Sequence, residues 1–191
     1  MRKNGSLQLL LRKIMECYKD WNKITESCKN CSIKEGCEHN SVFIESSVFV
    51  NIILYQSKDP IKAEKSFNHY KNTCITYTSH LCIGKIFDRL IKAYNIENKI
   101  NKSNATDLFY DLCERAKSLL NGVTLLEIDT DTLRHGLDLL RTEGKDYENR
   151  DRIILATAIS HKCLTFLSSD NNFIERIKKR DLNCPLKITK F

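Results

Sequence analysis

The sequence predicts an α/β fold with a mainly parallel sheet covered by helices on both faces. Short apolar strand patterns alternate with helical patterns along most of the 191 residues, and such alternation is typical of βαβ units. Glycine (6) and proline (2) are scarce, which disfavours turn-dense barrels and sandwiches. Apolar residues make up 41% of the chain and charged residues 29%, enough apolar material for one core.

The first forty residues differ from this pattern. Leu7, Leu11 and Ile14 recur at three- and four-residue spacing, so residues 7–25 are expected to form a helix. Residues 26–40 have no period and contain three cysteines, which indicates a connector or a metal knuckle. We therefore expect residues 1–40 to form an N-terminal helix with a cysteine-rich segment, followed by one domain over residues 41–191.

The first elements of that domain are marked by their capping residues. Residues 41–45 are a short buried-strand pattern, and Ser46-Ser47 provides an N-cap for a helix over 48–56. Pro60 suits the first turn of a helix to position 70. Residues 73–77 predict the next strand, and Thr78-Ser79 can cap a helix over 80–94.

The second half repeats the alternation. Asn121-Gly122 can close a helix over 105–120, and Asp129 can cap one over 130–141. Further helices are expected at 150–161 and 171–179, and strands at 123–128, 163–167 and 186–188.

Composition limits the compartment and the partners. The net charge of +7 makes an anionic partner plausible. The apolar stretch 48–55 is far shorter than the ~20 residues that span a bilayer, and no secretory leader is recognisable. We expect a cytoplasmic protein with no membrane contact, in which the nine cysteines are free thiols or metal ligands rather than disulfides.

Three acids fall at one predicted edge of the sheet. Glu45 ends the first strand, Asp170 follows strand 163–167, and Asp151 begins the helix that leads into that strand. Ligand sites of open parallel sheets lie outside the carboxyl ends of the strands, and converging carboxylates suit hard divalent cations. Each acid also has a structural interpretation: Asp151 complements a helix dipole, Asp170 is a good helix cap, and Glu45 can be a solvated strand end.

Three segments carry a resemblance to a known family. Residues 41–51 (SVFIESSVFVN), 151–159 (DRIILATAI) and 164–173 (LTFLSSDNNF) resemble the first, third and fourth motifs of the PIN-domain (PilT N-terminus-like) nucleases, in the same order over residues 41–190. The resemblance implies a three-layer α/β/α fold and a metal-dependent endoribonuclease that uses Mg²⁺ or Mn²⁺. Carried over, Glu45, Asp151 and Asp170 are the catalytic and metal-binding acids.

The same resemblance implies partners. Many PIN proteins are toxins of toxin–antitoxin pairs and others process ribosomal RNA. RNA as substrate, an antitoxin or other protein partner, and a homodimer are accordingly expected for this chain.

Two positions depart from the family pattern. Glu45 stands at the family's first acid, which is usually Asp, and Lys85 stands where the second acid is usual. A lysine there replaces attraction for a metal with repulsion, and its ammonium could pair with Glu45 and Asp151. Asp88, three residues on along the same helical face, could stand in for the missing acid. Two functions stay open: a nuclease weakened by Glu45 and Lys85, or a catalytically inactive RNA-binding or protein-interaction module.

The cysteine-rich segment offers a second, separate metal site. Cys28, Cys31, Cys37 and His39 supply three thiols and an imidazole within twelve residues, and zinc favours four such ligands. Cys17 is an alternative fourth ligand, and four cysteines would also suit an iron–sulfur cluster. Free thiols are the remaining interpretation.

Basic residues suggest where RNA could lie. Arg176, Lys178, Lys179 and Arg180 form the densest cationic cluster, and Lys58, Lys62 and Lys65 recur at helical spacing. Phosphate neutralisation by such side chains dominates affinity for nucleic acids, although a solvated helix face would show the same pattern.

Overall fold

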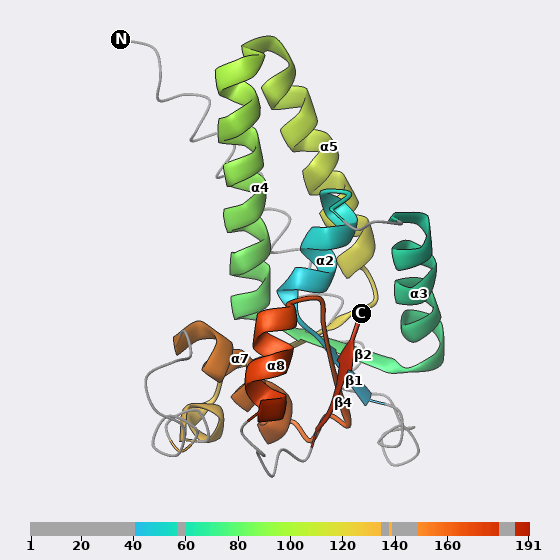
Figure 1. The fold of residues 1–191 in the computed structure, drawn as a ribbon, viewed down its shortest axis with the longest axis vertical. Helices are drawn as coiled ribbons and strands as arrows, with labels where there is room; N and C mark the ends of the chain where they lie inside the picture. Colours follow the sequence, from blue (N-terminus) through green and yellow to red (C-terminus); the bar gives the residue numbers. More distant parts are fainter. Residues whose placement is uncertain (1–40, 57–59, 135–137, 139–148, 180–185) are drawn as a thin grey trace. The chain divides into compact units, whose positions relative to one another are not determined.

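Five parallel strands in the order β3-β2-β1-β4-β5 form the centre of the fold (Figure 1). The strands are β1 (Ser41–Ile44), β2 (Ile75–Ser79), β3 (Thr124–Leu126), β4 (Thr165–Ser168) and β5 (Lys187–Lys190). The computed structural model describes residues 41–56, 60–134, 138, 149–179 and 186–191. The predicted helix over 7–25 and the cysteine segment lie outside these residues.

Helices cover the sheet on both faces, which confirms the predicted three-layer α/β/α class. They are α2 (Ser46–Ile53), α3 (Pro60–Thr73), α4 (His80–Ile100), α5 (Lys102–Leu120), α7 (Asn149–Ser160) and α8 (Asn171–Lys179). Residues 130–134 are also helical. Among the residues described, no helix is both long and apolar enough to cross a bilayer.

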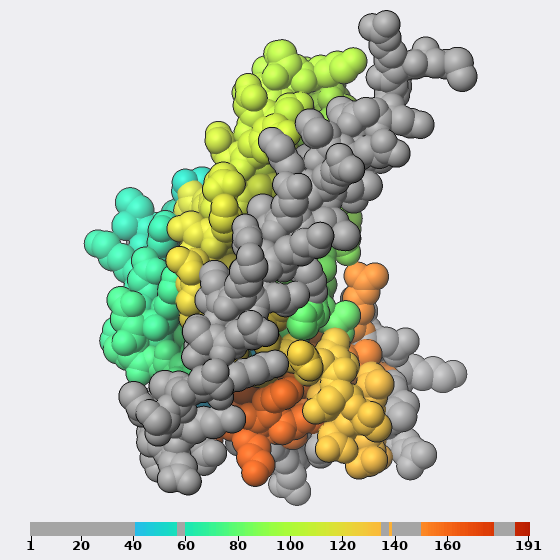
Figure 2. Space-filling view, turned by 180° about the vertical axis from the view of Figure 1, so that it is seen from behind, coloured from blue at the N-terminus to red at the C-terminus, as the bar shows by residue number. Residues whose placement is uncertain are grey.

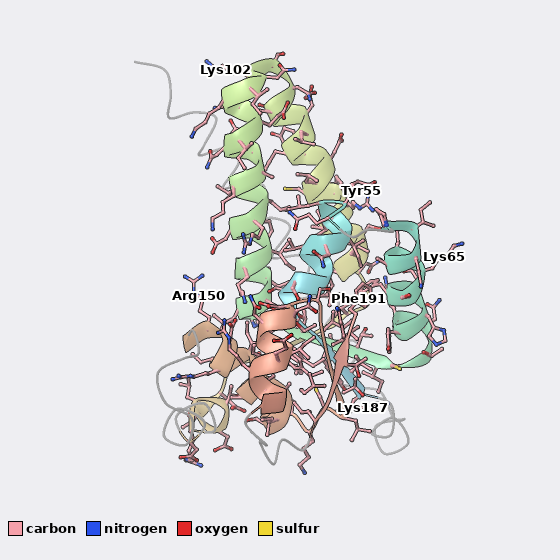
Figure 3. The ribbon with its side chains drawn as sticks, in the orientation of Figure 1. Tyr55, Lys65, Lys102, Arg150, Lys187 and Phe191 are labelled. Carbon is pink, nitrogen blue, oxygen red and sulfur yellow. The ribbon has the colours of Figure 1, made fainter. Side chains whose placement is uncertain are left out.

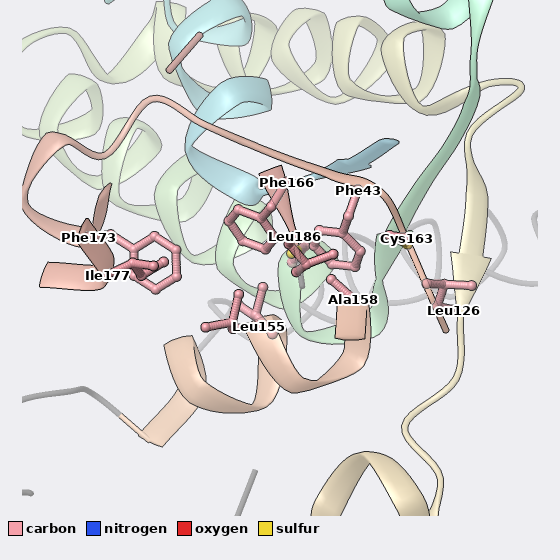
Figure 4. Close-up of a cluster of buried hydrophobic side chains, with 11 residues drawn as sticks. Phe43, Leu126, Leu155, Ala158, Cys163, Phe166, Phe173, Ile177 and Leu186 are labelled. Atoms are coloured by element: carbon pink, nitrogen blue, oxygen red, sulfur yellow. The ribbon is translucent and has the colours of Figure 1, made fainter. Parts of the chain in front are cut away.

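The middle strand holds the sheet in the core. All four residues of β1 are buried, because β1 pairs in parallel with β2 on one side and with β4 on the other. Phe43 stacks on Phe166 of β4 with ring centroids 5.3 Å apart. Leu155 from α7 and Phe173 from α8 belong to the same buried cluster (Figure 4). This packing fixes the ends of β1 and β4 relative to α7 and α8.

The boundaries of several elements differ from the sequence prediction by a few residues, and two of the differences have an identifiable reason. The second strand covers Ile75–Ser79 rather than 73–77, and its buried Thr78 donates a hydrogen bond from its hydroxyl to the carbonyl of Ile44, at 2.9 Å. The strand therefore runs up to the N-cap, Ser79. Helix α4 continues to Ile100 instead of ending at 94, because its last turns pack along α5: Tyr94 meets Phe109 edge to face with centroids 5.6 Å apart.

The α4–α5 pair packs on α2, and α5 also contacts α3. The two helices run side by side in opposite directions (Figure 1). Arg115 of α5 donates to Glu64 of α3 over 3.2 Å and lies 3.7 Å from the ring centroid of Tyr55, and the surfaces of α3 and α5 meet in the space-filling view (Figure 2).

Candidate functional site

Glu45 lies at the carboxyl end of the central strand and caps α2. Its Oε2 accepts a hydrogen bond from the backbone N–H of Ser47 at 2.8 Å, and its Oε1 accepts one from the hydroxyl of Ser46. Only 4% of the residue is exposed. The sequence interpretation of Glu45 as a solvated strand end is therefore wrong, because the turn into α2 folds the carboxylate inward.

Lys85 of α4 links two of the predicted acids. Its Nζ donates to Oδ1 of Asp151 at 2.8 Å and to Oε1 of Glu45 at 3.4 Å. The exposed fractions of the side chains are 26% for Lys85, 6% for Glu45 and 14% for Asp151. The structure thus shows the pairing that the sequence suggested for Lys85.

The ion pairs also set the protonation state of Lys85. Burial disfavours its charged form, but the nearby carboxylates of Glu45 and Asp151 outweigh that cost and raise the pKa of the Lys85 ammonium above its ordinary value. Lys85 is therefore fully charged at neutral pH.

Serine hydroxyls connect the ends of β1 and β4. The hydroxyl of Ser168 donates to Oε2 of Glu45 at 3.4 Å and lies 3.3 Å from the hydroxyl of Ser47. The backbone N–H of Ser169 donates to the Ser47 hydroxyl at 2.9 Å. These contacts join residues more than 120 positions apart, so periodicity in the sequence could not reveal them. The only local sign of this serine network in the sequence is the pair of serines after Glu45 and the pair before Asp170.

Asp170 lies near this network but serves α8. Its Oδ1 accepts from the backbone N–H of Phe173 at 3.1 Å, and its own N–H donates to the Ser168 hydroxyl at 3.1 Å. The residue is exposed. Asp170 therefore has the helix-capping geometry that the sequence offered as its structural interpretation.

Asp88 pairs with Arg150, at the N-terminal end of α7 (Figure 3). The Arg150 guanidinium donates to Oδ2 of Asp88 at 3.2 Å, and both side chains are more than half exposed. Asp88 thus lies one turn beyond Lys85 on α4 in a surface ion pair of its own. Its proposed role as a replacement acid stays a prediction.

Cys82 lies beneath the acidic site on the first turn of α4. It is completely buried, and burial, with a further contribution from the charge of Glu45, raises the pKa of its thiol to about 11. Cys82 is accordingly a neutral packing residue, as the sequence predicted for the cysteines of this domain.

A cavity of about 290 Å³ opens at the same edge of the sheet. It is lined by residues of α2, α3, the end of β5 and the residue after it: Asn51, Lys62, Ala63, Ser66, Tyr70, Lys190 and Phe191. Asn51 is one helical turn from Ser47, and the backbone N–H of Phe191 donates to the carbonyl of Ser168 at 2.9 Å. Of these residues, the sequence singled out only Lys62, because the cavity is assembled from separate elements.

The described residues include only some of the basic and cysteine residues that the sequence predicted as sites. Arg176 is a half-buried residue of α8, and Lys178 and Lys179 belong to the same helix, although the structure describes only their backbone. Arg180, Lys58 and the possible zinc ligands Cys28, Cys31, Cys37 and His39 lie outside the described residues.

The comparisons with known proteins place the fold. The family model described as PIN domain matches residues 42–179. The chain belongs to the PIN-domain family. PIN proteins form a family of ribonucleases. Among the curated proteins, none matches this chain.

Two solved structures of low sequence identity share the fold, and a third is similar over a smaller part of the chain. A chain of "VapBC2 from Rickettsia felis bound to a DNA fragment from their promoter" is 12% identical, with a TM-score of 0.55 over 79% of this chain and 98% of that one. VapBC-1 from nontypeable Haemophilus influenzae is 12% identical, with a TM-score of 0.50 over 78% and 97%. Mycobacterium tuberculosis VapC20, named a Sarcin-Ricin loop cleaving toxin, is 13% identical, with a TM-score of 0.48 over 70% and 93%.

PIN nucleases generally use divalent metals, so the acidic site can be tested against that requirement. The carboxylates of Glu45, Asp151 and Asp170 have the right chemistry for Mg²⁺ or Mn²⁺. However, Lys85 holds two of them, and no three His, Cys, Asp or Glu side chains in the described part of the chain lie together as metal ligands. The side chains as they lie do not fit a divalent ion.

Proposed function

We propose that this chain is a PIN-type endoribonuclease whose activity is weakened by Lys85. The observation that carries the proposal is the contact of the Lys85 ammonium with Glu45 and Asp151, two of the three acids at the sheet edge. Glu45, Asp151 and Asp170 are the residues that would hold a divalent ion if Lys85 released them, and such an ion would supply activation of water and stabilisation of charge on a phosphate. The lysine engages those acids and so lowers the activity.

The basic cavity supports RNA as the substrate class. It lies next to the acidic site through Asn51 and Phe191, and Lys62 and Lys190 bring positive charge to it. A phosphodiester strand that reaches the acids would also meet these two lysines, and the net charge of +7 favours such a strand from a distance. Arg176 and the C-terminal turn of α8 are a second place where the strand could bind, as the sequence suggested.

Protein partners belong to the proposal as well. The family resemblance supports an antitoxin-type partner and a homodimer, and the VapBC names of two similar structures are consistent with both. The proposed compartment is the cytoplasm.

A catalytically inactive RNA-binding or protein-interaction module is the second candidate. The specific observation in its favour is the same ion-paired lysine, together with the lack of a three-ligand metal cluster among the residues described. In this case the PIN domain would bind RNA or a protein through its surface without cleaving RNA.

Cleavage of a mixed RNA panel with Mg²⁺ or Mn²⁺ distinguishes the two candidates. We expect slow cleavage by the wild type and a further loss of about tenfold or more in Asp151→Asn. Asp111→Asn, the same chemical change at an exposed position of α5, is the matched control and should cleave like the wild type. Equal cleavage by Asp151→Asn would overturn the assignment of the site, and RNA binding without cleavage would establish the inactive module.

A second variant pair tests the route of the RNA. Lys62 lines the cavity, whereas Lys65 of the same helix lies on its outer side (Figure 3). Lys62→Glu should weaken RNA binding several-fold and reduce the salt dependence by about 0.7 log units per log unit of salt, the contribution of one phosphate contact in single strands. Lys65→Glu is the matched control. Equal effects of both substitutions would show that the cavity is not on the route.

A further inference from the structure

The acidic site already contains a cation of its own. Lys85 reaches it from α4 and donates to one oxygen of Asp151 and one oxygen of Glu45. An ammonium is a point charge with three donors, and here two of its donors hold the carboxylates that a divalent ion would need. A divalent ion and this ammonium therefore compete for the same two oxygens, and their like charges repel.

The hydrogen bonds of Glu45 strengthen this conclusion independently. Its Oε1 accepts from Ser46 and from Lys85, and its Oε2 accepts from the N–H of Ser47 and the hydroxyl of Ser168. An ionised carboxylate has about four lone-pair sites, so four donors satisfy it. Buried as it is, Glu45 has four donors within the protein, two of them, Lys85 and Ser168, at 3.4 Å.

We propose that Lys85 is the resident cation of this PIN site and closes it to divalent ions. The inference relies on the proposed function only for the location of the site. Mg²⁺ requires near-octahedral oxygen ligands and gives up its water reluctantly, and a carboxylate already saturated by four donors offers it little. When Lys85 is replaced, one lone pair each of Glu45 and Asp151 becomes free, and the exposed residue Asp170 follows β4 at the same edge of the sheet.

Direct ion binding without RNA tests the proposal. Mn²⁺ is titrated into purified protein at neutral pH, and free Mn²⁺ is measured by its electron paramagnetic resonance signal. Wild type should show no saturable uptake up to about 1 mM, a concentration at which extracellular-type oxygen sites of modest affinity already fill. Lys85→Glu should bind one ion per chain, and Lys85→Gln should bind one ion more weakly, since it removes the ammonium without adding a carboxylate.

Lys92→Glu and Lys92→Gln are the matched controls. Lys92 is exposed two turns further along α4, so these variants change the net charge equally without touching the site. They should resemble the wild type. If Lys85→Glu takes up no more Mn²⁺ than Lys92→Glu, or if the wild type binds one ion that Asp151→Asn abolishes, the proposal is wrong.

Two further measurements separate the Mn²⁺-binding result from loss of folding and from loss of RNA cleavage. Circular dichroism and urea unfolding are recorded for every variant, and if Lys85→Glu does not fold, Lys85→Gln decides by the same criterion. RNA cleavage is measured separately. A wild type that cleaves RNA while failing to bind Mn²⁺ leaves the inference standing and removes the metal-dependent part of the proposed function. A wild type that binds one Mn²⁺ at this site and cleaves RNA overturns the inference and leaves the proposed function standing.

Discussion

Two ion pairs join the same two helices, and they differ mainly in burial. Lys85 and Asp151 pair at 2.8 Å between α4 and α7 with side chains 26% and 14% exposed. Asp88 and Arg150 pair at 3.2 Å between the same helices with side chains 57% and 62% exposed. The polarity is reversed, with the cation on α4 in the first pair and on α7 in the second. Burial, rather than the presence of an ion pair, distinguishes the site from the surface.

The difference in burial matters because it decides whether water can solvate a charge that has lost its partner. When an exposed partner is removed, water solvates the remaining charge, so such pairs contribute about 0–1 kcal/mol. When the ammonium of Lys85 is removed, Glu45 and Asp151 remain facing the same space with two negative charges. The comparison therefore predicts unequal responses to matched substitutions.

Removal of the Lys85 charge should have the largest effect on stability. Lys85→Met is expected to lower the free energy of unfolding by about 2 kcal/mol, less than the ~3–5 kcal/mol of a fully buried pair, because Lys85 is partly exposed. Urea unfolding at pH 7 measures the change, with Lys92→Met as the control. A loss below about 0.5 kcal/mol, the range of ordinary surface substitutions, would remove the distinction between the two pairs.

The pH dependence of that loss sharpens the comparison. The pKa of Lys85 is raised in the folded protein, so its contribution is complete below the pKa of the unfolded chain, about 10.4, and is lost as pH rises through the higher folded value. The stability gap between wild type and Lys85→Met should stay constant around neutral pH and shrink above about pH 10.4. Urea unfolding at several pH values tests this, and a gap that shrinks between pH 7 and pH 9 would contradict the assignment to Lys85.

The smallest effect is expected at the exposed pair. Asp88→Asn should change the free energy of unfolding by about 0.5 kcal/mol or less, and the change should diminish further at about 1 M salt, where the screening length is about 3 Å. Parallel urea curves at low and high salt provide the measurement. A salt-resistant loss as large as that of Lys85→Met would mean that the two pairs are equivalent.

The sequence predicts the fold correctly where the structure depends on local patterns. The 171–179 helix and its cap at Asp170 follow from local sequence and are confirmed, and the family motifs place Glu45 and Asp151 on the correct elements. The pairing of Lys85 with both acids followed from a lysine standing at a position where an acid is usual.

The remainder depends on contacts between distant segments. The Ser47–Ser168 contact bridges 121 positions, and the cavity combines Asn51, Tyr70 and Phe191 from separate elements. The inward orientation of Glu45 also depends on β4, because the Glu45 N–H donates to the carbonyl of Leu167 at 2.9 Å. No pattern within a single segment contains this information.

The burial of Cys82 makes the alkylation rate of its thiol a measure of local opening near the acidic site. Thiols react with alkylating reagents as thiolates, and a pKa of about 11 keeps this one protonated and shielded from reagent at neutral pH. Its modification therefore requires a local opening that exposes the first turn of α4, one turn before Lys85. The labelling rate of Cys82 reports how often the site opens, a local equilibrium distinct from global unfolding.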